Sequence, residues 1–236
     1  MKKISIIIPA LNEEENLEKA VRDLCSALKS EISGDGWEVL IFDDGSTDKT
    51  GEIADNLAVS NAHIKVVHNG KNMGLGYNFR KGVELARGEY VTWFPGDGEN
   101  EVGSTIVTLK HIGDADIIIP YTSNMEVRTF KRRIVSRIYT GLVNFFFGLN
   151  LRYYNGLSVY KKDLLMKVPA WGNSFAFAVE ILVPLLKSGV SFIEVPIKIK
   201  LTIKTSALKL KNIFKVGLAL SSLFWRIIIK KERIKI

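Results

Sequence analysis

The chain has 236 residues, 47% of them hydrophobic and 25% charged, which excludes a disordered chain and allows one large α/β domain or two small ones. The formal net charge of +8 is concentrated in residues 128–236, and this asymmetry suggests a polyanion or an anionic membrane surface as a partner. The single cysteine, Cys25, excludes a disulfide framework and suggests a reducing compartment.

Short apolar runs alternate with helical patterns through the first 120 residues. We expect strands at residues 4–9, 37–42, 64–68, 90–94 and 116–120, the first of them too short and too soon followed by acids for a signal peptide. We expect four helices. The first would be capped by Asn12, the second would span 49–59, the third would follow a glycine-rich turn at 69–76, and the fourth would span 102–112. This rhythm predicts an α/β fold, with a doubly wound, mostly parallel sheet and helices on both faces. Right-handed crossovers would bring the strand-end loops to one edge.

The rhythm changes near residue 121. A basic segment, RTFKRR, opens an expected helix over 128–150, with apolar residues at helical spacing: Ile134, Ile138, Leu142, Phe145 and Leu149. We expect strands at 153–160 and 190–200, the latter broken by Pro196, and helices at 175–187 and 208–230. The last helix is amphipathic, and its longest uncharged stretch, 216–225, is well short of the roughly 20 residues of a membrane span. We expect it to lie on a membrane surface; packing against the core is the alternative.

Polar clusters follow three strands: PALNE, DDGS and PGDGE. In an open α/β sheet, ligands bind at the carboxyl ends of the strands, and hard divalent cations bridge carboxylates to phosphates. Each cluster alone could be a helix cap or an exposed acidic turn. Together, on one edge, they predict a pocket in which Asp97 and Glu99 hold a metal-bound diphosphate. Asp43 and Asp44 would accept hydrogen bonds from a ribose or a base.

Other ligand motifs do not fit. The glycines at 74 and 76 lack the third glycine of a dinucleotide fingerprint, and the chain has no GKS or GKT of a P-loop. His63, His68 and His111 have no ligand spacing and are expected to be structural. Nucleic acid is not expected as a partner, because the basic residues accompany apolar helical stripes and not an exposed aromatic sheet.

Several segments resemble family 2 glycosyltransferases with the GT-A fold, a Rossmann-like fold: SIIIPALNEEENL, VLIFDDGSTDKT, NMGLGYNFRKGVELARGEYV and PGDGE. The segments RRIVSRIYTGL, GLSVYKK, FAVE and IEVP resemble the dolichyl-phosphate mannosyltransferase branch, which loads a sugar onto a polyprenyl phosphate. The resemblance covers about residues 3–210. It implies a GT-A domain at 1–206, with a nucleotide-sugar half at 1–120 and an acceptor half at 121–206. A basic amphipathic, membrane-associating tail would follow at 207–236.

The resemblance also implies roles for individual residues. Asp97 would be the retained acid of the family's D-x-D motif and would bind Mg²⁺ or Mn²⁺, with Glu99 in place of the usual glutamine. The catalytic residues would be Asp97, Arg132 and Glu180. The nucleotide would be bound by Pro9, Ala10, Asn12, Glu13, Asp43, Asp44 and Gly74. The acceptor phosphate would be bound by Arg128, Arg132, Ser136 and Arg137.

The chain departs from the family pattern at three places. Pro95 replaces the first acid of D-x-D and cannot ligate a metal, Tyr153 replaces an acid of the branch, and Lys204-Thr205-Ser206 is what remains of an Arg-x-x-Gly-x-Ser-Lys motif. With these changes, the sequence does not decide how strongly the protein would bind a metal or the diphosphate.

The expected reaction is an inverting transfer of a sugar from a nucleotide-sugar donor to a polyprenyl phosphate, at the cytoplasmic face of a membrane, in cell-envelope glycan synthesis. A phosphate acceptor is largely ionised near neutral pH, its second pKa being about 6, so no strong protein base is needed. A transferase acting on a glycan or another acceptor is one alternative. A noncatalytic, membrane-associated nucleotide-sugar-binding subunit is another. The sugar, the nucleotide, the acceptor length and the oligomeric state stay open.

Overall fold

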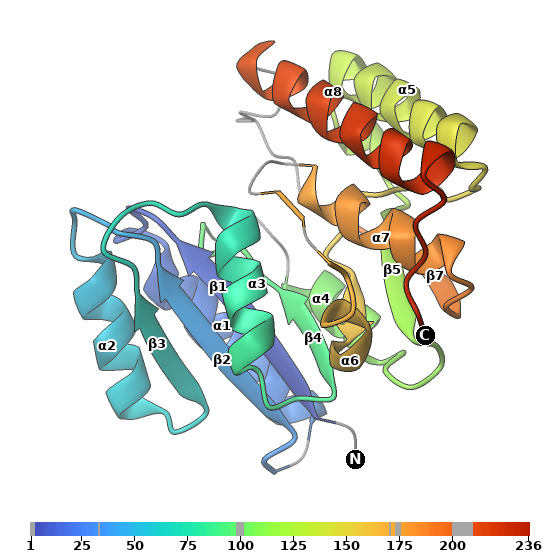
Figure 1. Cartoon of the computed structure of the whole chain (residues 1–236). Helices are drawn as coiled ribbons and strands as arrows, with labels where there is room; N and C mark the ends of the chain where they lie inside the picture. Colours follow the sequence, from blue (N-terminus) through green and yellow to red (C-terminus); the bar gives the residue numbers. More distant parts are fainter. Residues whose placement is uncertain (1–2, 33, 98–101, 170, 173–175, 200–209) are drawn as a thin grey trace.

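The computed structural model describes residues 3–32, 34–97, 102–169, 171–172, 176–199 and 210–236. Its centre is a seven-stranded sheet of order β3-β2-β1-β4-β6-β5-β7 (Figure 1). The strands are β1 (Ile4–Ala10), β2 (Trp37–Asp43), β3 (Ile64–His68), β4 (Tyr90–Trp93), β5 (Ile117–Thr122), β6 (Val159–Lys161) and β7 (Phe192–Ile197). Neighbouring strands are parallel except at β6, which runs antiparallel to β4 and β5. The predicted mostly parallel α/β sheet is confirmed.

Helices cover both faces of the sheet because the central strands are apolar on both sides. Along β1, Ile6 and Ile8 belong to one hydrophobic cluster and Ile7 to the other, as the alternation of side chains in a strand requires. The first cluster includes residues of α1 (Leu17–Glu31), α2 (Thr50–Ser60) and α4 (Val102–Leu109). The second includes residues of α3 (Leu75–Leu85), α5 (Phe130–Phe147), α6 (Lys162–Leu165), α7 (Phe177–Lys187) and α8 (Leu210–Phe224).

The second half differs in detail from the expectation. Of the strand predicted at 153–160, only Val159 and Tyr160 lie in β6. The prediction that Pro196 breaks the last strand was wrong, since β7 continues to Ile197 and pairs Pro196 with Tyr121. The reason is position: β7 is an edge strand, where the missing N–H of a proline need not interrupt the ladder.

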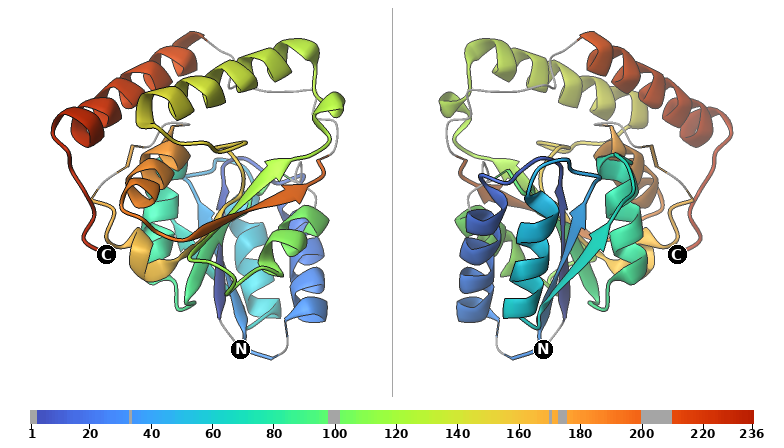
Figure 2. Two further views of the ribbon diagram at one scale, coloured as in Figure 1. Left: turned by 90° about the vertical axis from the view of Figure 1, so that its right-hand side faces the viewer. Right: turned by 90° about the vertical axis from the view of Figure 1, so that its left-hand side faces the viewer.

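The helices α5 and α8 form an outer layer at the end of the molecule toward which β1 and β2 run (Figure 2). They contact each other at their carboxyl ends, where the ring of Phe224 lies 5.7 Å from that of Phe146 and 6.3 Å from that of Phe147. Leu223 and Ile227, the latter in a π-helical turn at Trp225–Ile229, are buried in the core. One side of α8 therefore packs against the domain. Among the described residues, no helix is both long and apolar enough to cross a membrane.

Candidate functional site

The loops that follow β1 and β2 are joined to each other. The backbone N–H of Asn12 donates to Oγ of Ser46 (3.0 Å), and its side-chain Oδ1 accepts from the backbone N–H of Thr47 (2.9 Å). The prediction that Asn12 caps the first helix was wrong: α1 begins at Leu17, with Asn16 at the N-cap position. The physical reason is that the Asn12 side chain is taken up by Thr47. With φ of 54°, Asn12 also adopts a left-handed conformation that asparagine tolerates well.

Asp43 ends β2 and lies almost fully buried beside the end of β3. Its Oδ1 accepts from the backbone N–H of Ser46 (3.0 Å), and its Oδ2 lies 3.0 Å from Nδ1 of His68. The other ring nitrogen of His68 lies 3.0 Å from Oδ1 of Asp55. Burial pushes the pKa of Asp43 upward, but the hydrogen bonds from Ser46 and His68 outweigh it and hold the pKa below its ordinary value. Asp43 is therefore a carboxylate at neutral pH, and the hydrogen bonds of His68 with Asp43 and Asp55 raise the pKa of its ring.

Asp44, a predicted nucleotide ligand, also connects two loops of the fold through hydrogen bonds. Its Oδ1 accepts from the backbone N–H of Met73 (2.8 Å) and from Nδ2 of Asn69 (2.9 Å), and its Oδ2 accepts from the backbone N–H of Gly74 (2.9 Å). The residue is only 4% exposed. Gly74 has φ of 88°, which glycine adopts without strain. Asp44 thus holds the loop before α3 against the end of β2.

The loop after β4 packs directly on the end of β1. A Cβ atom placed on Gly96 would lie 3.3 Å from Cβ of Ala10 and 3.4 Å from the carbonyl oxygen of Pro9. Burial raises the pKa of Glu13, and the negative charge of Asp97 raises it further against the lowering effect of a hydrogen bond from Asn16. Asp97 and Glu13 therefore share one edge of the sheet, and the strand-end clusters predicted from the sequence come together.

The donor set at this edge suits a hard divalent cation. Two neighbouring carboxylates supply oxygen ligands, and Mg²⁺ usually completes its shell with waters and substrate phosphates. Among the described residues there is no group of three or more side chains that could hold a metal without such help. Glu99, the second predicted ligand, lies outside the described residues. The residues present thus fit a metal that is held jointly by protein and substrate.

The inward face of α5 carries the predicted phosphate-binding residues Arg132 and Ser136. Thr129 caps the helix, its Oγ1 accepting from the backbone N–H of Arg132 (3.4 Å). Arg132, Ser136 and Tyr139 are spaced by four and three residues, so they share a helix face, and all are partly buried. The pKa of Tyr139 is raised mainly by burial and further by nearby groups that include Glu180. Glu180, in the first turn of α7, accepts from the backbone N–H of Gly172 (2.8 Å).

Arg128 lies beside the same region and Arg137 does not. Both terminal nitrogens of Arg128 donate to the Tyr153 hydroxyl (3.2 Å each), and its guanidinium lies 5.2 Å from the centre of that ring. Tyr153 in turn lies close enough to Tyr139 to affect its pKa. Arg137 is exposed and, five residues after Arg132, lies about 140° away around the helix.

Sequence reasoning missed the contacts of three residues at the strand ends and around α5. His68 was expected to be structural, which its contacts agree with, but its bridging of Asp43 and Asp55 was not predicted. Tyr139 received no role, although its spacing from Arg132 and Ser136 places it on their face. Tyr153 was noted only as the replacement of an acid, and its contact with Arg128 depends on packing between segments 25 residues apart.

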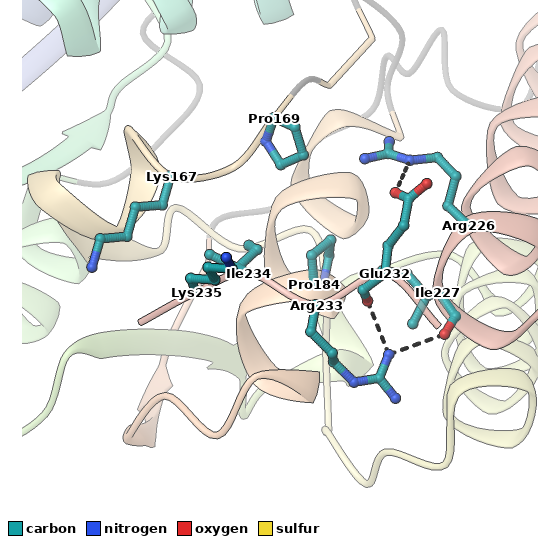
Figure 3. Close-up of a pocket in the computed structure, with 9 residues that line it drawn as sticks. All are labelled: Lys167, Pro169, Pro184, Arg226, Ile227, Glu232, Arg233, Ile234 and Lys235. Carbon is teal, nitrogen blue, oxygen red and sulfur yellow. Dashed lines mark hydrogen bonds and ion pairs between the residues drawn. The ribbon is translucent and has the colours of Figure 1, made fainter. Parts of the chain in front are cut away.

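A separate pocket of about 130 Å³ lies between the end of α8 and α7 (Figure 3). Its lining residues are Lys167, Pro169, Pro184, Arg226, Ile227, Glu232, Arg233, Ile234 and Lys235. An ion pair joins Arg226 to Glu232 (2.8 Å), and Arg233 donates to the carbonyl oxygen of Ile227 (3.0 Å). None of the predicted site residues lines this pocket, so it is distinct from both clusters.

The sheet order, with carboxylates at adjacent strand ends, defines the class: this is the GT-A glycosyltransferase fold. The glucosyl-3-phosphoglycerate synthase of Mycobacterium tuberculosis, solved with Mn²⁺, UDP and glucosyl-3-phosphoglycerate, superposes with a TM-score of 0.70. The match has 17% sequence identity and covers 94% of this chain and 80% of that one.

The sequence family is equally clear. The family model "Glycosyl transferase family 2" matches residues 5–168, so the chain belongs to glycosyl transferase family 2. It is 25% identical to the glycosyltransferase AglD of Haloferax volcanii over 97% of this chain and 38% of that protein. It is 35% identical to the dolichyl-phosphate beta-glucosyltransferase ALG5A of Trichomonas vaginalis, over 46% of this chain and 35% of that protein. The chain therefore spans well under half the length of these relatives.

Proposed function

We propose that the protein transfers a sugar, with inversion, from a nucleotide-sugar donor to a polyprenyl phosphate at the cytoplasmic face of a membrane. The observation that carries the proposal is the placement of two opposite clusters at the same end of the fold. Carboxylates of Glu13 and Asp97 lie at the strand ends, and the cations Arg128 and Arg132 belong to the segment that crosses the same end (Figure 2). Support for a lipid-linked acceptor comes from relatives such as the dolichyl-phosphate glucosyltransferase.

The donor would be held at the edge formed by β1, β2 and β4. Asp43 is a fixed acceptor of hydrogen bonds, and the loop joined by Asn12 and Ser46 would line the nucleoside with Pro9 and Ala10. Asp97, with Glu13 beside it and Glu99 following, would hold Mg²⁺ or Mn²⁺. Such a metal, when bound, stabilises the negative charge that grows on the departing diphosphate.

The acceptor phosphate would be held by Arg132 and Ser136, with Arg128 beside them. Arginine pairs with phosphate through charge-assisted hydrogen bonds, which fix both the position and the orientation of the nucleophile. Glu180 lies beneath the same face, near Tyr139, where a carboxylate can orient an acceptor group. No strong base is required, because the phosphate is already ionised.

The test is a screen of radiolabelled nucleotide sugars against polyprenyl phosphate, with and without divalent metal. Asp97→Ala should abolish transfer while leaving the melting temperature unchanged. Full transfer by that variant would contradict the metal assignment.

A matched pair of arginine variants tests the acceptor assignment. Arg132→Gln should raise the KM for the acceptor by about 10- to 150-fold, the equivalent of one charged hydrogen-bond contact of about 1.5–3 kcal/mol. Arg137→Gln removes an exposed guanidinium from the same helix. An equal rise in KM for Arg137→Gln would mean that both predicted arginines bind the phosphate; an effect of neither would remove α5 from the acceptor site.

One observation favours a second candidate. Pro95 stands where the family has the first D-x-D acid, and this loss is what a noncatalytic nucleotide-sugar-binding subunit would tolerate. Metal-dependent binding of a nucleotide sugar without hydrolysis or transfer, to lipid or to glycan acceptors, would favour that reading.

A further inference from the structure

Trp171 lies in the segment between α6 and α7 and is bound to α3. The residue is 6% exposed, and its indole Nε1–H donates to the carbonyl oxygen of Gly76 in the first turn of α3 (3.0 Å). Arg80, one turn further along the same helix, donates to the carbonyl oxygen of Trp171, and its guanidinium lies 5.1 Å from the centre of the indole ring. Hydrogen bonds and a cation–π contact therefore hold both the side chain and the backbone of Trp171 against α3.

The next residue, Gly172, holds the carboxylate of Glu180. Its backbone N–H donates to Oε2 of Glu180 (2.8 Å), and a Cβ atom placed on Gly172 would lie 3.1 Å from the same oxygen. A glutamate side chain has several rotatable bonds, and a charge-assisted hydrogen bond from a fixed backbone N–H selects among its rotamers. The carboxylate that is oriented in this way is the one whose charge raises the pKa of Tyr139 on α5.

The other end of the contact lies at the predicted donor site. Gly74, at the N-cap position of α3, donates its backbone N–H to Asp44, a predicted nucleotide ligand (2.9 Å). The ring of Phe79, in the same helix, is fully buried and lies 6.1 Å from the ring of Trp171. A continuous series of contacts therefore joins Asp44, through α3 and Trp171, to Glu180. Because protein interiors are close-packed, a change in one of these contacts is felt by its neighbours.

We infer that Trp171 is a positioning residue for the transfer reaction: through Gly172, it holds the carboxylate of Glu180 in place. It also joins that carboxylate to the loop at 69–74, which belongs to the predicted donor site. The inference rests on the proposed function, since a positioned Glu180 matters for turnover only if it meets an acceptor. Trp171 itself is buried and acts without touching either substrate.

Two variants break the contact in different ways. Trp171→Phe keeps an aromatic ring and removes the indole N–H, while Gly172→Ala places a methyl group against Oε2 of Glu180 at a residue whose φ is outside the left-handed region. Each should lower kcat by about 10- to 100-fold, as expected when a group at the reacting centre is displaced by about 1 Å, and leave the KM for the donor unchanged. Trp37→Phe is the matched control. Trp37 is equally buried but begins β2, at the opposite end of that strand from Asp43, so its replacement should leave kcat unchanged.

A double-mutant cycle with Glu180→Gln separates positioning from general packing. If Trp171 acts through Glu180, adding Trp171→Phe to Glu180→Gln should lower kcat by less than about twofold. Full additivity of the two effects would assign Trp171 to packing alone and overturn the inference. An unchanged kcat in both Trp171→Phe and Gly172→Ala would overturn it as well.

Amide hydrogen exchange of Gly172, followed by NMR, tests the contact without any substrate. Exchange should be faster by about tenfold or more in Trp171→Phe and in Glu180→Gln, and unchanged in Trp37→Phe. If the wild type shows this pattern but transfers no sugar to any lipid phosphate, the proposed function is rejected and the positioning contact stands. An unaltered exchange rate in Trp171→Phe would refute the inference whatever the activity.

Discussion

Removing the carboxylate of Asp44 should lower the stability of the fold, in addition to any effect on nucleotide binding. In Asp44→Ala the backbone N–H groups of Met73 and Gly74 lose their acceptor inside the protein, whereas Asn69 keeps its second acceptor, Oδ1 of Asn78 at 2.7 Å. Two part-buried donors left without an acceptor, at about 1–3 kcal/mol each for full burial, give a loss of at most about 4 kcal/mol in the free energy of unfolding. In Asp44→Asn the amide oxygen still serves one of the two donors, so the loss should be about half.

Urea unfolding measures this directly as a shift of the midpoint at constant slope. The control is Asn56→Ala, since Asn56 is exposed on α2 and surface substitutions usually change stability by no more than about 0.5 kcal/mol. A loss below about 1 kcal/mol in Asp44→Ala, together with abolished nucleotide binding, would refute the reasoning. Asp44 would then contact the ligand and would not be needed to hold the loop at 69–74 in place.

Three further predictions follow from particular contacts. His68 should titrate with a pKa above its ordinary value of 6.5, as measured by NMR, because of its hydrogen bonds with Asp43 and Asp55. Since that pKa is higher in the folded state, the stabilisation is present below the unfolded pKa and is lost as pH rises through the folded one; an unshifted resonance, or no effect of Asp55→Asn on it, would contradict this. Tyr153→Phe removes the hydroxyl that accepts from Arg128 and should raise the acceptor KM about fivefold at constant kcat, as expected for about 1 kcal/mol; a kcat effect alone would speak against a positioning role. Gly82→Ala should destabilise by about 1–3 kcal/mol, because its Cβ would lie 2.5 Å from Cδ1 of Ile7, whereas Gly103→Ala, with open space around it, should be neutral or stabilising; equal effects on thermal unfolding would show that Ile7 yields easily.

The strands of the sheet could be predicted from the sequence where they are buried on both faces. Every residue of β2 is buried, and a continuous apolar run bounded by polar turns leaves little choice of structure or register. The segment before β6 was not readable, because its backbone is held by side-chain contacts. The amide of Asn144 both donates to and accepts from the backbone of Leu151, and its Oδ1 also accepts from the Tyr154 hydroxyl. Such contacts replace a strand ladder and leave no periodic signal.

In the candidate site too, some features could be predicted from the sequence and others could not. Topology alone brings the residues after β1, β2 and β4 to one edge, so the sequence is sufficient to group Glu13, Asp43 and Asp97. The partners of each carboxylate could not be predicted, because they come from distant loops. Asp44 is fixed by N–H groups about 30 residues away, and His68 reaches Asp43 across 25 residues.

The helix α5 shows why periodicity identifies an amphipathic helix but not the medium on either side of it. The sequence contains two offset sets: the exposed stripe with Ile138 and Phe145, and the inward set with Arg132, Ser136 and Tyr139. The usual assumption, that the apolar set faces the protein, would bury Phe145 and expose Arg132. The fold instead leaves Phe145 exposed and Arg132 partly buried, and the apolar residues that α5 buries in the core are Val143 and Phe147. The period of the exposed stripe alone therefore cannot say which apolar residues of α5 pack in the core, because a second apolar pair on the same helix does so.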